Sequence, residues 1–395
     1  MARLRARGLA ALVASLALAG GCAATTAASN RPENGRPAAP APPAAVPPAP
    51  LPATTPAVRA SAAPSRLWPF KHLFNTDYVD VRAIAERYGL TPAWVTSGRV
   101  LQLVDERGRV RLRFEDRNHD FHLDGVRVFM GWATISYQGS LYVSKIDVIK
   151  TIGPLLRPAD QAGQLPAPPR LIVLDPGHGG NDPGNQNSAL RLAEKDMTLD
   201  VARRLKKVLE ARGYRVLLTR ADDRRVELED RDIIAARANA DLFLSIHFNA
   251  LPPALASRVS GTETYALTPQ FQVSAGGERD KLTDLALPGN RQDVSNVVLG
   301  FQLQRRLLAE LKTSDRGFKR ARWVVLRFAG CPAALIEAAF LSHDAEARRV
   351  ATPEFRQQIA EAIAGGVDDY AATLAALPRP ATLPAKTPAP RASSK

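Results

Sequence analysis

The stretch LIVLDPGHGG, residues 171–180, decides how this chain of 395 residues is expected to fold. It opens with four consecutive apolar residues, which is typical of a strand buried on both faces of a sheet. Residues 194–212 then carry apolar side chains mostly at helical spacing, and Gly213 ends the pattern. The sequence therefore predicts a buried strand and a helix, joined by a turn whose glycines let the backbone bend around His178.

The same alternation continues along the chain. Residues 214–219 and 242–247 have the pattern of strands, and residues 228–240 have the pattern of a helix. Strands that alternate with helices predict an α/β fold with a mostly parallel sheet flanked by helices on both faces. Such sheets place their sites at the carboxyl ends of the strands, where His178 and His247 both fall.

Three residues of this region have the chemistry of zinc ligands. A catalytic zinc ion needs three nitrogen or carboxylate ligands and keeps a fourth position open. His178, His247 and Glu194, which begins the first predicted helix, could supply them. Each also has a simpler explanation, because a strand-end histidine is often structural, a glycine-rich turn can bind phosphate, and an early helical glutamate complements the helix dipole. Spacing alone leaves both interpretations open.

Four motifs in sequence order are similar to those of one enzyme family. They are LDPGHGG at 174–180 with DPG at 182–184, EKDMTL at 194–199, ADLFLSIHFN at 240–249, and LIEAAFLS at 335–342. On these motifs, residues 171–374 resemble the zinc-dependent N-acetylmuramoyl-L-alanine amidases of the third amidase type. The sequences GTETY at 261–265 and DRG at 315–317 also resemble signatures of that family.

Matched residue by residue, the resemblance implies that His178, Glu194 and His247 bind Zn²⁺ and that Glu337 is the catalytic carboxylate. Such a glutamate takes a proton from the attacking water and delivers it to the leaving amine. Glu337 follows the apolar run 333–336, so we expect it at a strand end on the same rim as the ligands. The alternative role for Glu337 is that of a buried ion-pair partner.

Two residues differ from those usual in the family, and the role of one segment is undecided. Ala339 and His343 stand where the family usually has Gly and Asn, and we expect His343 outside the ligand set, which is already complete. The polar segment 268–292 is either a surface loop or a lid over the substrate groove. Some relatives carry a regulatory helix at about this place, so the resemblance also implies an activator protein as a partner.

The resemblance implies hydrolysis of the amide between N-acetylmuramic acid and L-alanine in peptidoglycan. One alternative is a zinc peptidase that acts within the stem peptide, and another is a noncatalytic peptidoglycan-binding protein. The formal net charge of +14 predicts attraction to polyanions. Nucleic acid is not an expected partner, because no aromatic and basic stripe or reading helix accompanies the charge.

The N-terminal region has the layout of an export signal. Arg3, Arg5 and Arg7 precede the apolar run 9–19, and small residues lead to Cys22. We expect residues 1–22 to be a signal peptide whose end resembles a lipobox, with Leu18 one place early, so ordinary cleavage is the alternative to lipidation. The protein would then be exported, periplasmic or in the cell envelope, and anchored to the outer membrane if Cys22 is lipidated.

The catalytic region is predicted at residues 171–377, and the other segments precede or follow it. Residues 23–66 and 378–395 are rich in Pro and Ala and are expected to be a disordered tether and tail. Residues 67–156 predict a small α+β accessory module with a helix at 81–88 and strands at 100–104 and 110–114. The module resembles the N-terminal stalk domain of copper amine oxidases, without copper, and residues 157–170 are expected to be a linker.

Overall fold

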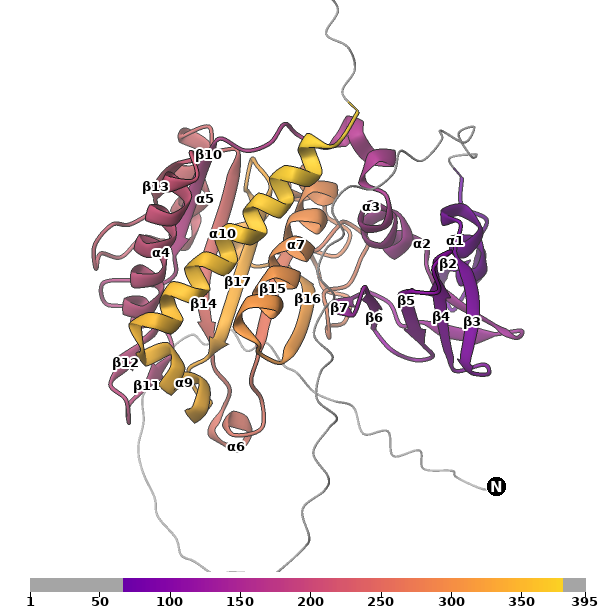
Figure 1. Ribbon diagram of the computed structural model, residues 1–395, viewed down its shortest axis with the longest axis horizontal. Helices are drawn as coiled ribbons and strands as arrows, with labels where there is room; N and C mark the ends of the chain where they lie inside the picture. The colour runs from indigo at the N-terminus through magenta and orange to yellow at the C-terminus, as the bar shows by residue number, and fades with distance from the viewer. Residues whose placement is uncertain (1–66, 379–395) are drawn as a thin grey trace, which may run out of the picture.

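The computed structural model describes residues 67–378 (Figure 1). The predictions for the signal peptide, Cys22, the tether and nearly all of the tail fall outside these residues. Within them, no helix combines the length and the apolar character that crossing a membrane requires.

The predicted parallel strands form one half of a large sheet. The strands of this half are β10 (Leu171–Pro176), β13 (Arg215–Leu218), β14 (Leu242–Asn249), β15 (Thr262–Leu267), β16 (Asp315–Ala321) and β17 (Ala333–Phe340). Their order is β13-β10-β14-β17-β15-β16, and every neighbouring pair is parallel except β17 with β15. The predicted α/β fold with a mostly parallel sheet is confirmed, with one reversal in its middle.

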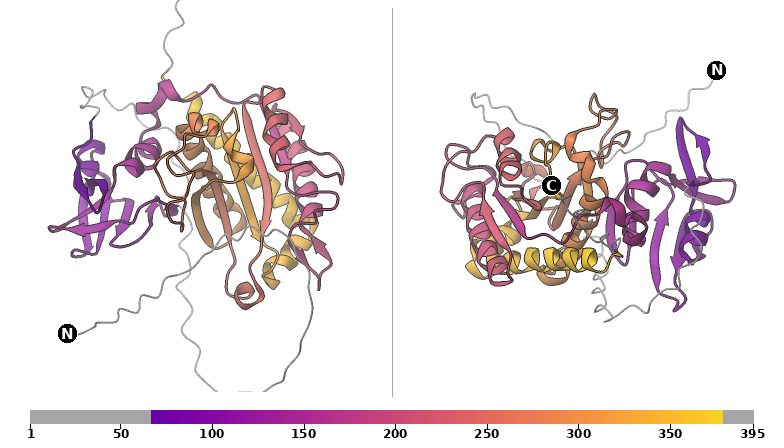
Figure 2. Two further views of the ribbon diagram at one scale, coloured as in Figure 1. Left: turned by 180° about the vertical axis from the view of Figure 1, so that it is seen from behind. Right: turned by 90° about the horizontal axis from the view of Figure 1, so that it is seen from above.

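Helices cover the two faces of this half unequally. On one face lie α4 (Glu194–Ala211), α7 (Asp293–Leu311), α9 (Asp344–Ala351) and α10 (Pro353–Ala375), as Figure 1 shows. The opposite face, seen from behind in Figure 2, carries α5 (Leu228–Arg237) and the short α8 (Val324–Arg327). Ala235 and Leu326 of these helices pack with Val173, Phe243 and Leu335 of the strands. Their packing involves the strand segments away from the carboxyl ends of β14 and β17, so α5 and α8 do not bury the region around His247 and Glu337.

The N-terminal module continues the same sheet. Its strands β3 (Thr91–Thr96), β4 (Val100–Val104), β5 (Val110–Glu115), β6 (Asp120–Leu123) and β7 (Val126–Phe129) form an antiparallel array. β7 pairs in parallel with β16, with Val128 opposite Phe318, so the sheet has 11 strands. Both residues are fully buried in one core, which therefore extends across the two parts of the chain.

A second, smaller sheet completes the module. It is formed by β1 (Lys71–Leu73), β2 (Thr76–Asp80), β8 (Ile135–Tyr137) and β9 (Ser140–Ser144). The helix predicted at 81–88 is present as α1 (Val81–Tyr88), and Gly89 ends it in the left-handed conformation. Half of the segment expected to be a linker forms a 3-10 helix, η2 (Pro158–Gln164).

Buried polar groups connect the module to the rest of the chain. The helical segments α2 (Lys145–Asp147), η1 (Val148–Ile152) and α3 (Gly153–Leu156) follow β9. The fully buried Asp147 carboxylate accepts hydrogen bonds from the backbone N–H of Gly131, at 3.0 Å, and from the side chain of Gln272. Arg320, also buried, donates to the carbonyl of Lys150 at 3.0 Å. The bond from Gly131 lies within the module, whereas those from Gln272 and Arg320 join it to the larger part of the sheet.

Replacing Asp147 by alanine is expected to lower the free energy of unfolding by about 3 kcal/mol, because several buried donors would lose their acceptor. Asp147→Asn keeps an acceptor oxygen and is expected to cost less than half as much. Denaturant titration of both variants measures the difference. Equal stability of the alanine variant and the wild-type chain would contradict this account of the contact.

The structure decides one open question about segment 268–292. Because β15 runs antiparallel to β17, the segment leaves the sheet at the end opposite to His247 and Glu337. It is held there by Arg322, which donates to the carbonyls of Pro269 and Gln272. The lid interpretation of this segment is therefore wrong, and it is a loop packed at the far end of the sheet.

Candidate metal centre

Three side chains predicted as ligands converge at the carboxyl ends of β10 and β14. His178 follows β10, Glu194 is the first residue of α4, and His247 lies on β14. One donor atom from each lies within 4.8 Å of the other two. His178 Nε2 is 3.2 Å from one Glu194 carboxylate oxygen, and His247 Nδ1 is 2.9 Å from the other.

Local backbone geometry makes this convergence possible. His178 has a φ of 60°, a left-handed conformation that is uncommon for a residue with a side chain. A Cβ atom on Gly177 would lie 2.2 Å from the His247 ring, and one on Gly184 would lie 2.6 Å from the His178 ring. Glycine is required at both positions because the backbone passes directly beside the imidazoles.

Hydrogen bonds orient the three donors. His178 Nδ1 is 2.9 Å from the Asp182 carboxylate, which leaves Nε2 directed toward Glu194. Glu194 is almost fully buried and accepts hydrogen bonds from the backbone N–H groups of Asn185, at 2.9 Å, and Phe248, at 3.0 Å. These contacts fix the carboxylate between the two imidazoles.

The charges of the cluster suit a divalent cation. Burial disfavours ionisation of Glu194, but hydrogen bonds with His178 and His247 hold the pKa of its carboxyl far below the ordinary value. Burial also opposes the charge of His178, yet its contacts with Glu194 and Asp182 raise the pKa of the imidazole to about 8. Two imidazole nitrogens and one carboxylate are the donor set of catalytic zinc sites, so the residues fit a zinc ion.

The raised pKa of His178 predicts how metal affinity depends on pH. Below about pH 8 the metal-free imidazole carries a proton on the donor nitrogen, and this proton must leave before a metal binds. We therefore expect the apparent zinc affinity to fall about tenfold per pH unit below pH 8 and to level off above it. Competition titrations with a chelator of known affinity measure this slope. An affinity that stays constant from pH 8 down to about pH 7 would contradict the prediction.

Glu337 lies beside the cluster but not where the sequence placed it. It is inside β17, not beyond its end, and is paired directly with His247 on the adjacent strand β14. The strand continues to Phe340 because residues 338–340 stay apolar and buried. Among residues 67–378, Glu337 makes no ion pair, and its buried Oε2 atom has no hydrogen-bond partner. Burial first, and then the charges of Glu194 and Glu263, raise the pKa of this carboxyl well above its ordinary value.

Sequence reasoning did not assign a place to Glu263, the cross-strand neighbour of Glu337 on β15. Its buried carboxylate accepts hydrogen bonds from Asn249, at 2.7 Å, and the Tyr265 hydroxyl, at 2.8 Å, and pairs with Lys319. The GTETY motif was the only signal for it. His343, by contrast, begins α9 as its N-cap and accepts a hydrogen bond from the Glu346 N–H at 3.4 Å, outside the ligand cluster as expected.

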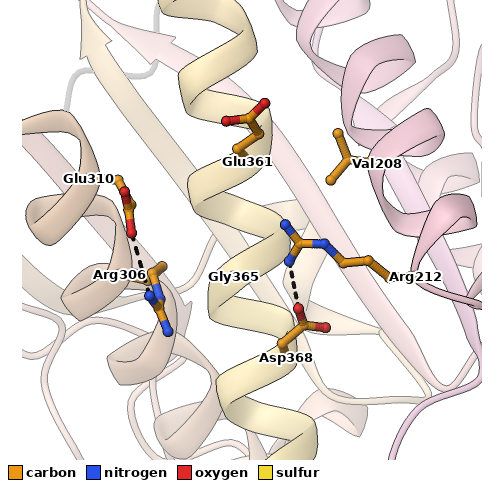
Figure 3. Close-up of a pocket in the computed structure, with 7 residues that line it drawn as sticks. All are labelled: Val208, Arg212, Arg306, Glu310, Glu361, Gly365 and Asp368. Atoms are coloured by element: carbon orange, nitrogen blue, oxygen red, sulfur yellow. Dashed lines mark hydrogen bonds and ion pairs between the residues drawn. The ribbon is translucent and has the colours of Figure 1, made fainter. Parts of the chain in front are cut away.

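A hollow of about 530 Å³ lies away from this cluster, among α4, α7 and α10 (Figure 3). Its charged groups largely satisfy one another, as in the pairs Arg212–Asp368, at 2.5 Å, and Arg306–Glu310, at 3.4 Å. The helices α4, α7 and α10 pack against the face that carries Ile246 and Ile336. The next residue on each strand, His247 or Glu337, points to the opposite face, so the hollow lies away from both. We therefore take the cluster of His178, Glu194 and His247, and not this hollow, as the candidate site.

Comparison with known proteins identifies the family of the chain. Residues 172–369, half of the chain, match the family model described as N-acetylmuramoyl-L-alanine amidase. The chain belongs to this amidase family. The matched residues contain His178, Glu194, His247 and Glu337, whereas the N-terminal module lies outside them.

Several relatives illustrate the family. The uncharacterized protein YqiI of Bacillus subtilis is 33% identical over 215 residues, which is 54% of this chain and 91% of YqiI. The amidase AmiA of Escherichia coli is 30% identical over 61% of this chain and 89% of its own length. The amidase LytC of Bacillus subtilis is 34% identical over 53% of this chain, but only 37% of LytC is covered. A solved amidase structure from Clostridium difficile 630 has 31% identity and a TM-score of 0.43, covering 52% of this chain and 97% of that one.

Proposed function

We propose that this chain is a zinc-dependent amidase that hydrolyses the bond between N-acetylmuramic acid and L-alanine in peptidoglycan. Membership of the amidase family supports the reaction class. The observation that carries the proposal is the placement of Glu337 directly opposite His247, one of three convergent donors. A metal-dependent hydrolase needs such a proton-transferring group beside the metal ion that activates the water and the scissile carbonyl.

His178, Glu194 and His247 would hold the zinc ion. When bound there, zinc supplies Lewis acidity toward the scissile carbonyl and makes a water molecule more acidic. The buried Glu194 carboxylate balances part of the positive charge, and Asp182 keeps His178 in the orientation that ligation needs.

Glu337 would act as the general base and then as the general acid of the reaction. Its carboxylate takes a proton from the attacking water, and the resulting acid gives that proton to the nitrogen of the leaving L-alanine. Its Oε2 atom, buried and without a partner in the described part of the chain, is available for this exchange. Burial raises the pKa of Glu337, and the higher proton affinity makes its carboxylate a stronger acceptor for the proton of the attacking water.

Two other functions remain as outcomes of the test. A zinc peptidase acting within the stem peptide would use the same ligands and differ only in the bond it cuts. A noncatalytic peptidoglycan-binding protein would not need the isolated carboxylate of Glu337 next to the ligands, and this observation favours an enzyme.

The location of the protein is part of the proposal. Because the substrate is cell-wall peptidoglycan, we propose that residues 1–22 direct export, that Cys22 attaches the chain to a lipid, and that an activator protein controls it. The N-terminal module would be a stalk-like accessory part that carries no copper. Mass spectrometry of the mature N-terminus tests the lipid attachment.

The full chain, incubated with purified peptidoglycan, tests the reaction. Zinc-dependent release of free stem peptides that begin with L-alanine, prevented by a chelator, is the expected result. Shorter peptides would move the cleaved bond into the stem and support the peptidase. Stoichiometric zinc binding without release would support the binding protein or an enzyme that needs its activator.

A further inference from the structure

The face of the sheet that carries Glu337 continues past it over β15 and β16. Residues on these strands that share this face are Glu263 and Tyr265 on β15 and Lys319 on β16. At the end of the strands nearest the metal ligands, a β-bulge in the β15–β16 pairing sets Thr262 opposite Asp315 and Glu263 opposite Gly317. The residue left over in the bulge is Arg316. Bulges of this kind redirect a side chain next to a site.

Arg316 is held in place without being hydrogen-bonded. Its guanidinium lies 5.7 Å from the centre of the Phe340 ring, and its Nε atom is 3.7 Å from the Glu263 carboxylate. This Nε is buried and has no hydrogen-bond partner among residues 67–378, and no other guanidinium nitrogen of Arg316 donates a hydrogen bond to those residues. The side chain is 26% exposed, so its free donors can reach a ligand in solution.

The carboxylates around Arg316 already accept from other donors. Glu263 contributes one negative charge, and the buried Lys319 ammonium already pairs closely with it. The Asp315 carboxylate is occupied by Gln304, at 2.9 Å, and by the Gly317 N–H, at 2.8 Å. The two terminal NH2 groups of Arg316, which lack an acceptor in the described residues and lie next to a carboxylate that Lys319 already pairs with, form a binding group for a planar anion such as a carboxylate.

Two glycines make room for this arrangement. A Cβ on Gly261 would lie 2.9 Å from the Arg316 stem. One on Gly317 would lie 2.7 Å from the ring of Phe129, which the N-terminal module contributes beside β16. Arg127, the neighbouring cation of that module, is already paired with Asp120 at 2.5 Å. Arg316 is therefore the cation of this region that is open to a new partner.

We propose that Arg316 binds a carboxylate of the stem peptide on the leaving-group side of the scissile amide, and so selects substrates that carry this charge. The inference rests on the proposed function, because Glu337 there delivers a proton to the leaving amine and the peptide then extends from Glu337 over β15 and β16. Arg316 on β16 is two strand spacings from Glu337 on β17, or about 10 Å. Two extended residues span about 7 Å, and the Arg316 side chain extends back over β15 to Glu263, so the second residue of the stem peptide reaches its guanidinium.

Paired substrates test the proposal. Two N-acetylmuramoyl dipeptides are compared, one with a free carboxylate on its second residue and one with the corresponding amide. The zinc-loaded full chain is expected to release the peptide from the carboxylate form about tenfold faster, as for one charge-assisted hydrogen-bonded pair. Arg316→Gln is expected to bring the ratio close to one, whereas Arg316→Lys keeps part of the preference because the charge remains.

Controls separate this role from folding and overall charge. Arg348→Gln removes the same charge from α9, where the side chain is 68% exposed, and is expected to leave the ratio unchanged. Thermal unfolding of each variant shows whether the fold is intact. A wild-type ratio near one, or a ratio that Arg316→Gln does not change, would overturn the proposal.

A binding measurement distinguishes the failure of this inference from the failure of the proposed function. The two dipeptides are titrated into the Glu337→Gln chain, which does not turn them over, with and without Arg316→Gln. Tighter binding of the carboxylate form that depends on Arg316 supports the inference even if no release is seen with any variant. Equal binding of both forms overturns the inference while leaving amide hydrolysis to be decided by the release assay.

Discussion

Replacement of Glu337 by glutamine is expected to reduce the rate of peptide release by about a hundredfold to ten-thousandfold, the usual contribution of a general acid–base group. Glutamine has nearly the same shape but cannot accept the proton of the attacking water. Since Glu337 makes no hydrogen bond through Oε2 within residues 67–378, the exchange removes little structure. Initial rates of release from peptidoglycan measure the effect.

Metal content is the essential second measurement on this variant. Glu337 is not one of the three convergent donors, so the glutamine variant should retain stoichiometric zinc. Glu361→Gln on α10, at the hollow of Figure 3, makes the same chemical change on the other face of the sheet and should not alter the rate. Nearly full activity of the Glu337→Gln chain would remove Glu337 from the mechanism.

Replacement of Glu194 by alanine is expected to abolish stoichiometric zinc binding, and activity with it. Glu194 lies between His178 and His247 and provides the charge of the ligand set. Its loss should weaken binding by more than the roughly 100-fold that accompanies loss of an outer hydrogen-bonding partner. Metal analysis after dialysis against a weak chelator, together with circular dichroism to verify the fold, measures this effect.

Asp182→Asn provides the matched comparison, because Asp182 contacts His178 but is not one of the three donors. It should weaken zinc binding by about 10- to 100-fold only. If the Glu194→Ala chain retained one zinc per molecule, or if both variants weakened binding equally, the assignment of Glu194 as a ligand would have to be abandoned.

The sequence by itself determined the elements whose signals are local. The apolar run at β10 and the helical spacing of α4 are such signals, and so is the glycine that ends α1. Both histidines and Glu194 stand at the ends or starts of these elements, and parallel strands bring their carboxyl ends to one side of a sheet. This is why the sequence predicted the convergence of His178, Glu194 and His247.

Only the tertiary structure decided the features that depend on how distant strands pair. The antiparallel pairing of β15 with β17 sets Glu263 beside Glu337 and sends segment 268–292 to the opposite end of the sheet. The bulge that exposes Arg316, and the pairing of β7 with β16 that brings Phe129 next to Gly317, join residues far apart in the chain. Strand order and register follow from the burial of whole faces against one another, and the local pattern of a single strand carries no information about which strand lies beside it.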